Sequence, residues 1–156
     1  MKKFSVVILI GISFGCFGQN QGVSNIWLMG YQSLAGPPGG QTRINFFSGS
    51  PVITYDSVQM DFRHTHANIS DTAGNMLFYT NGHYIADATD HIMQNGNGIN
   101  PGAYANAFSD GFMIAQGALV IRKPDSYNIY YLFHCSVDNY PDLTGSVSLH
   151  LRMSVI

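Results

Sequence analysis

Closely spaced histidines and aspartates are the first residues in this sequence whose types suggest chemistry. His64 and His66 are separated by one residue, and in a β-strand this spacing places both imidazoles on one face, where they can share a metal ion. Two ligands do not make a site, so the fold would have to supply others from a group of polar residues further along: His83, Asp87, Asp90 and His91. The alternative is that these histidines and aspartates are ordinary polar residues at the ends of strands. We therefore treat His64 and His66 as weak metal candidates and expect no cofactor.

Two further patterns carry the residue types of catalysis. Cys135 follows His134, a nucleophile beside a base, but neighbours in a strand point to opposite faces, so we expect a buried structural cysteine. Asp71 lies in a turn-forming segment, where we expect it to bond turn amides while Gly74 or Asn75 adopts a positive φ. A glycosidase needs two paired carboxylates, and nothing in the sequence singles out a pair among the nine aspartates. We assign no catalytic residue.

The segment from residue 94 to residue 116 is the best candidate for binding. It has no sustained hydrophobic period, it begins with an Asn/Gly-rich run that favours turns over a calcium loop, and a short helix near residues 103–109 fits its centre. Loops of this length in compact domains are usually functional. The tentative binding residues are its aromatic side chains and one acid, with packing inside the loop as the alternative: Tyr104, Phe108, Asp110 and Phe112.

The elements that position these residues follow from composition. Hydrophobic residues make up 46% of the chain and charged residues 10%, so the chain has enough apolar surface for a core and we expect a folded domain. Glutamate is absent while Gly is abundant, which argues against a helical bundle. The formal net charge is -2, which offers no basic surface to nucleic acid or anionic lipid.

The first eighteen residues predict export. Lys2 and Lys3 precede an uncharged apolar run that ends at Phe17, which is the pattern of a signal peptide cleaved near Gly18. The run is shorter than the roughly 20 residues that cross a bilayer, so we expect no transmembrane segment. The alternative is a lipoprotein that keeps Cys16 as its acylated first residue. After cleavage near Gly18, Cys135 would be the only thiol, and no intrachain disulfide would form.

The rest of the chain, residues 19–156, is predicted to form one β-rich region. Residues 58–63 and 146–155 alternate apolar and polar, which predicts strands with one buried face. Residues 76–79 and 129–133 are unbroken apolar runs, which are typical of strands covered on both faces. Six more strands are predicted at residues 26–32, 43–47, 52–55, 67–70, 83–87 and 117–122.

Two predicted hairpins, with turns at residues 70–75 and 123–128, repeat at an offset of about fifty residues. This period predicts an all-β, mainly antiparallel fold with two to three blades of a partial β-propeller. A β-sandwich is the alternative. A closed propeller needs about four or more blades, so we expect the chain to be the N-terminal part of a longer protein and, taken alone, to self-associate through its last strand.

Several segments resemble the N-terminal region of exported Bacteroidetes surface proteins. The matching stretches are the NIWLMG, ISDTAGNMLFYTNG, MQNG and YYLFH motifs at residues 25–30, 69–82, 93–96 and 130–134. The resemblance implies a propeller-like ectodomain of the adhesion type. It also implies that the type IX secretion machinery exports this ectodomain to the outer cell surface or into the medium. It supplies no catalytic residues.

Together these observations predict an exported, non-catalytic module that binds protein or glycan at the cell surface. The alternative is part of a secreted hydrolase, glycosidase-like, with an active site completed beyond residue 156. The hypothesis of a non-catalytic binding module is based on the predicted signal peptide and on the lack of a recognisable group of catalytic residues in the sequence.

Overall fold

The computed structural model describes residues 22–31, 39–56, 58–139 and 146–156. Within these ranges the chain forms three antiparallel sheets of three strands each, with very little helix. The all-β, antiparallel prediction is therefore confirmed. The predicted signal peptide, its cleavage near Gly18 and the alternative acylation of Cys16 lie outside the described residues.

Each sheet is a meander of three consecutive strands. Sheet A contains β1 (Ile26–Tyr31), β2 (Gly40–Asn45) and β3 (Val52–Asp56); sheet B contains β4 (Ala67–Ser70), β5 (Met76–Thr80) and β6 (Ile85–Asp87); sheet C contains β7 (Ala118–Arg122), β8 (Tyr130–Asn139) and β9 (Ser146–Val155). A 3-10 turn, η1 (Gly22–Ser24), precedes β1, and the short helix α1 (Ala103–Ala107) lies between sheets B and C. No helix among these described elements is long and apolar enough to cross a membrane.

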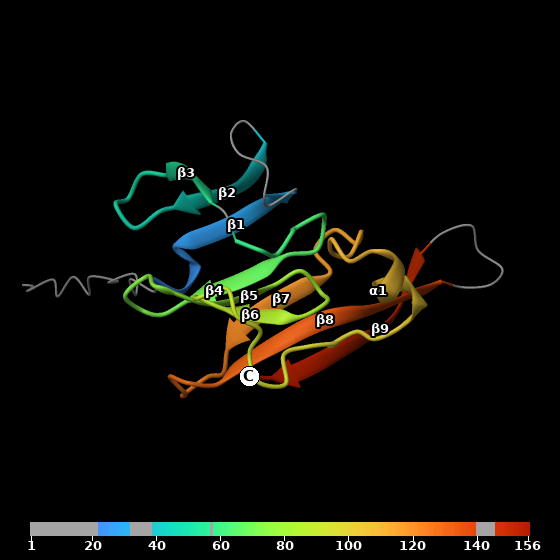
Figure 1. Cartoon of the computed structure of the whole chain (residues 1–156). Coiled ribbons are helices and arrows are strands. Elements are labelled where there is room, and N and C mark those ends of the chain that lie inside the picture. The colour runs from blue at the N-terminus through green and yellow to red at the C-terminus, as the bar shows by residue number, and fades with distance from the viewer. Residues whose placement is uncertain (1–21, 32–38, 57, 140–145) are drawn as a thin grey trace, which may run out of the picture.

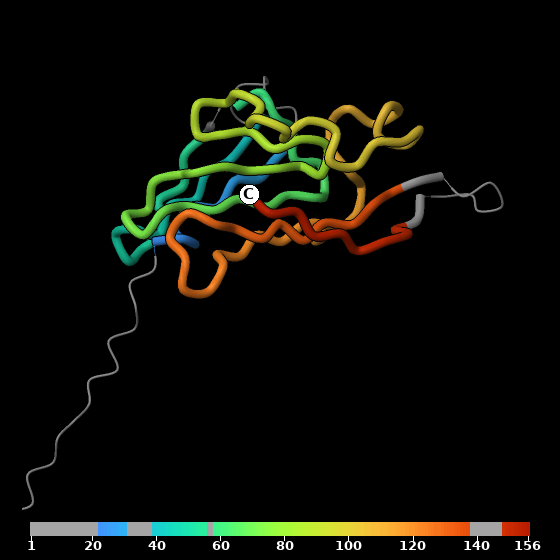
Figure 2. Tube along the Cα trace, turned by 90° about the horizontal axis from the view of Figure 1, so that it is seen from below, coloured from blue at the N-terminus to red at the C-terminus, as the bar shows by residue number. Residues whose placement is uncertain are grey.

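The three sheets are layered in chain order, with sheet B in the middle (Figure 1). One core lies between sheets A and B and includes Leu28 and Tyr79. A second core lies between sheets B and C and includes Phe78 and Leu132. The first strand of each sheet contacts the first strand of the next, β1 with β4 and β4 with β7. The β8–β9 hairpin extends past the ends of the other two sheets (Figure 2).

This layering explains which strands are covered. Strand β5 lies between two cores, so its apolar run is covered on both faces, as predicted. Strand β8 is covered on one face only: Tyr130 and Leu132 are buried, whereas Tyr131 and Phe133 point away from sheet B and remain partly exposed. The prediction of a doubly covered strand at residues 129–133 is wrong, because sheet C has a neighbour on one side only among the described residues. For the same reason the apolar face of β9, which the alternation at residues 146–155 predicted to be buried, is exposed.

The predicted strand at residues 58–63 is also wrong. Met60 and Phe62 are buried, as the alternation required, but this segment joins no sheet apart from one bridge between Phe62 and Gly30. Its backbone is satisfied by a side chain instead: Gln41 accepts a hydrogen bond from the Val58 amide and donates one to the Met60 carbonyl. Buried apolar residues therefore fixed the side-chain directions here without a strand ladder.

Candidate functional site

The loop between sheets B and C gathers the four predicted binding residues in one place. Tyr104, in α1, and Phe112 are fully buried, and Phe108 is half-buried beside them. The ring centroid of Tyr104 lies 4.6 Å from that of Phe108 and 5.5 Å from that of Phe112. These rings form a small core with Val137 of β8. Tyr104 and Phe112 therefore serve loop packing, the alternative that the sequence left open.

Asp110 ties the same loop to the segment before β4. Its carboxylate lies 2.9 Å from the guanidinium of Arg63, which also lies over the Phe108 ring at 5.9 Å from the centroid. Both charged side chains are partly exposed, so this ion pair contributes modestly to stability and mainly fixes geometry. A ligand can reach Phe108 and Asp110, and their role in binding remains a prediction.

A polar groove of about 550 Å³ opens between this loop and the start of β6. We define the polar groove by residues that carry amides, hydroxyls and aromatic rings, with backbone between them: His83, Tyr84, Asn97, Asn100, Asn106 and Ser109. No lining side chain carries a formal charge when His83 is neutral. The sequence analysis did not select Tyr84 or Ser109 as binding residues. For the asparagine side chains of the groove, the only indication in the sequence was the Asn/Gly-rich character of the loop.

His83 lines the groove and lies against the ring of Phe112, with centroids 4.6 Å apart. Burial lowers the pKa of its imidazole, against the opposing effects of the Phe108 backbone and the Asp110 charge. Its Nε2 atom is buried and has no hydrogen-bond partner among the described residues. A neutral His83 is therefore the stable form at neutral pH.

Asn100, one of the residues that line the groove, begins a chain of hydrogen-bonded polar groups that leads into the interior. Asn100, 3% exposed, donates from Nδ2 to the Gly82 carbonyl at 3.0 Å, which leaves its Oδ1 to accept from Nδ1 of His134 at 3.0 Å. Nε2 of His134 then accepts from the Ser154 hydroxyl of β9 at 3.1 Å. These bonds join the loop to the central strand β8 and the edge strand β9 of sheet C.

Ser154, His134 and Asn100 stand in the order of nucleophile, base and orienting residue. Two features argue that they stabilise structure. His134 is 2% exposed and lies inside the molecule, where a substrate does not reach it, and the orienting group is a neutral amide. An amide does not stabilise the imidazolium that a serine nucleophile requires. We therefore interpret the chain as a buried polar network.

No protein family, curated protein or solved structure matches this chain. Its function therefore rests on the chemistry of its own residues.

The histidine and aspartate candidates for a metal do not assemble. His64 and His66 are both exposed; His64 bonds the Met113 carbonyl through Nδ1, and His66 lies edge-on to Phe62. Within the described ranges, no three of the His, Cys, Asp and Glu side chains lie close enough to hold a metal ion. The pair therefore has no third ligand in this part of the chain.

The acids near the proposed metal set organise turns. Asp87 bonds the hydroxyl and amide of Thr89, which lowers its pKa, and Asp90 accepts from the Tyr79 hydroxyl and the Gln59 amide. The Asp87 bonds close the turn after β6, and the Asp90 bonds connect this turn to β5 and to the segment before β4. They explain the acidic cluster without a ligand.

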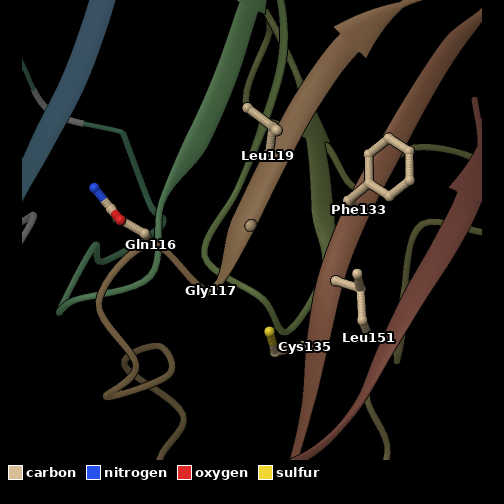
Figure 3. A pocket seen from close by; sticks show the side chains of 7 residues that line it. Gln116, Gly117, Leu119, Phe133, Cys135 and Leu151 are labelled. Carbon is tan, nitrogen blue, oxygen red and sulfur yellow. The ribbon is translucent and has the colours of Figure 1, made fainter.

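Asp71 takes the role that the sequence predicted, whereas the prediction for Cys135 is only partly correct. Asp71 accepts bonds from the amides of Ala73 and Asn75, and Gly74 has φ +86°, as the turn required. Cys135 projects from the face of β8 opposite to His134, so the two do not form a nucleophile–base pair. The thiol is free and partly exposed (Figure 3), not buried as predicted, because the outer face of sheet C is uncovered.

The buried network predicts a loss of stability in mild acid. Burial, and secondarily the charge of Arg152, holds the pKa of His134 below its ordinary value. The unfolded chain therefore takes up a proton near pH 6.5 that the folded chain resists, so stability is complete above that pH and falls below it. His83 acts in the same direction. We expect each histidine to contribute a loss of at most about 1.4 kcal/mol per pH unit.

Urea unfolding between pH 7.5 and pH 5, above the range of the carboxylates, measures this loss. A His134→Gln variant provides the comparison, since glutamine does not titrate. A wild-type urea midpoint that stays constant down to pH 5 would contradict the assignment of neutral buried histidines.

Proposed function

We propose that this chain is an exported, non-catalytic module that binds a neutral glycan in the polar groove. The observation that carries the proposal is the lining of the groove: Asn97, Asn106 and Ser109 offer exposed amides and a hydroxyl, and no ionised side chain lies among them. Sugar hydroxyls both donate and accept hydrogen bonds, and side-chain amides can meet both needs.

The aromatic content of the groove supports the same ligand. Tyr84 is half-buried and presents part of its ring together with its hydroxyl, a combination suited to the apolar face and polar rim of a sugar ring. Burial raises the pKa of Tyr84, so the hydroxyl stays protonated and remains a donor. The volume of the groove falls within the usual range for small-ligand sites.

We further propose that the three sheets are successive blades of a propeller-like assembly at the cell surface or in the medium. Support comes from the meander order, the side-by-side first strands and the face-to-face layering. Ile92 also bridges Ala86 beyond β6, which gives sheet B the beginning of a fourth strand. Three layered sheets differ from the two sheets of the alternative sandwich. The motif resemblance supports export by the type IX machinery.

Calorimetric titration with a panel of neutral oligosaccharides tests the binding proposal. We expect Asn106→Ala, which removes one exposed amide, to weaken binding by roughly fivefold to tenfold, the effect of about one hydrogen bond. Asn128→Ala is the matched control, because Asn128 is also exposed but lies in the β7–β8 turn outside the groove. Circular dichroism confirms that both variants fold.

Three outcomes would contradict the proposal. The first is that no oligosaccharide in the panel binds. The second is that Asn106→Ala and Asn128→Ala bind the oligosaccharide with the same affinity. The third is that the chain binds a protein partner and no glycan. Mass spectrometry of the oligosaccharide after incubation tests the alternative of a hydrolase, since release of shorter products would show catalysis.

A further inference from the structure

The sequence contains three Asn-Gly pairs, at residues 81–82, 95–96 and 97–98. In such a pair the backbone nitrogen of the glycine can attack the side-chain carbonyl carbon of the asparagine, because glycine has no Cβ to hinder the approach. This reaction is one reason why asparagine is a thermolabile residue. It requires an accessible asparagine side chain, a glycine N–H outside any hydrogen bond, and a backbone with room to turn. The structure treats the three pairs differently in these respects.

Hydrogen bonds close the first pair. Asn81 is 1% exposed, and its Nδ2 atom donates to the Asp61 carbonyl at 3.0 Å. Its Oδ1 atom accepts from the His83 amide at 3.0 Å. The Gly82 amide donates to the Thr80 hydroxyl at 3.1 Å. Both the group to be attacked and the attacking nitrogen of this pair are therefore engaged.

The second pair has an exposed side chain, at Asn95, but its attacking nitrogen is held. Gly96 is buried, and its amide donates to the Met93 carbonyl at 2.8 Å. The Gly96 carbonyl accepts from the Ile85 amide at 2.8 Å. A Cβ at Gly96 would lie 2.9 Å from the Ile85 carbonyl oxygen, so the backbone has no room to turn.

The third pair is open in all three respects. Asn97 and Gly98 are both exposed, and the Asn97 side chain lines the polar groove. Neither that side chain nor the Gly98 amide makes a hydrogen bond with any residue that the structure describes. A Cβ at Gly98 would meet no atom within 4 Å. The pair therefore lies free between two anchored neighbours, the bonded Gly96 and Ile99, whose amide donates to the His83 carbonyl.

We propose that Asn97 is a site of spontaneous deamidation, which converts the uncharged polar groove into an anionic one. The Gly98 nitrogen gives its proton to a solvent base and attacks Cγ of Asn97. A new C–N bond closes a five-membered succinimide ring, and the bond from Cγ to Nδ2 breaks as that nitrogen takes a proton and leaves as ammonia. Water then adds to either ring carbonyl and opens the ring to aspartate or isoaspartate. Water is the only co-reactant, and no atom is oxidised or reduced.

The products change the lining of the groove in two ways. No lining side chain carries a formal charge when His83 is neutral, so a carboxylate at position 97 is the first charge among them. A carboxylate accepts hydrogen bonds but does not donate them, so the donor function of Nδ2 is lost. Isoaspartate also lengthens the backbone by one methylene in the segment that leads to Asn100. We therefore expect the deamidated chain to bind a neutral glycan more weakly; this consequence rests on the function proposed above, whereas the modification itself does not.

Peptide mapping by tandem mass spectrometry of the folded full chain, incubated at mildly alkaline pH, tests the modification. We expect the peptide that contains Asn97 to gain about one mass unit, the difference between an amide and a carboxylic acid. The same gain is expected at least about tenfold more slowly at Asn95 and Asn81, because a hydrogen bond must open before attack.

Incubation in a denaturing concentration of urea provides the matched control, since the bonds that protect Asn81 and Asn95 are then absent. All three asparagines are expected to react at similar rates under these conditions. An Asn97→Gln variant should show no mass gain at position 97 in the same period, because its longer side chain would have to close a six-membered ring. An Asn97 that stays intact in the folded chain, or equal rates at the three sites of the folded chain, would overturn the proposal.

Calorimetric titration of fresh and incubated chain with a neutral oligosaccharide tests the consequence separately. We expect the affinity to fall roughly fivefold to tenfold on full conversion at position 97, the effect of about one hydrogen bond. Incubation of the Asn97→Gln variant should leave its own affinity unchanged. If fresh chain binds no oligosaccharide, glycan binding is wrong and the deamidation stands on the mass spectra. If converted chain binds as tightly as fresh chain, the expected effect of the charge on the groove is wrong.

Discussion

Replacing Phe112 by alanine is expected to lower the free energy of unfolding by about 3 to 5 kcal/mol. The Phe112 side chain is 1% exposed and its ring packs against His83, Tyr104 and Gly82. Truncation leaves a cavity beneath both the loop and the polar groove. The urea midpoint and slope of the variant measure the loss.

Phe47→Ala is the matched control, because Phe47 is the same residue type at 67% exposure. Its expected cost is within about 0.5 kcal/mol. Comparison of the Phe112→Ala and Phe47→Ala variants also shows whether Phe112 packs in the core or contacts a ligand. If Phe112 instead contacted a ligand, its truncation would reduce glycan affinity while the unfolding free energy stayed close to that of the control.

Replacing Asn100 by alanine is expected to cost about 2 to 4 kcal/mol, because it breaks two bonds of the buried network at once. The Gly82 carbonyl loses its donor, and Nδ1 of His134 is left buried without an acceptor. Because the network joins the loop to sheet C, we also expect faster amide hydrogen exchange in the loop. Equilibrium unfolding and hydrogen exchange measure the two effects.

Asn97→Ala removes an amide from the same groove at an exposed position and should change stability by no more than about 0.5 kcal/mol. An Asn100→Ala variant as stable as Asn97→Ala would show that the chain from Gly82 to Ser154 does not support the loop. The interpretation of Ser154, His134 and Asn100 as a structural network would then have to be given up.

Local pattern in the sequence determined most of the strands and turns of this fold. The alternation at residues 146–155 reproduces β9, and the apolar run at residues 76–79 lies within β5. The turn residues between the paired strands form hairpins, with Asp71 and Gly74 in the predicted roles, because Asx bonding and positive φ are properties of single residues. The short helix near residues 103–109 is also present as α1.

The sequence could not decide which face of a strand is covered. Alternation separates apolar from polar faces, but burial depends on whether a neighbouring sheet lies on that side. Leu132 and Leu151 belong to the same sheet, yet Leu132 is fully buried and Leu151 is 72% exposed. The same reason explains why Tyr104 and Phe112 form loop core, although their sequence context equally suited ligand contact.

Tertiary structure alone brought together the groups of the candidate site. Asn100 meets His134 across 34 positions in sequence and Arg63 meets Asp110 across 47, distances over which no periodicity carries information. Composition and local propensity act over a few residues and therefore set strands and turns. The polar groove, the buried network that begins at Asn100 and the exposed apolar face of β9 arise from the order in which three sheets stack, which only long-range packing decides.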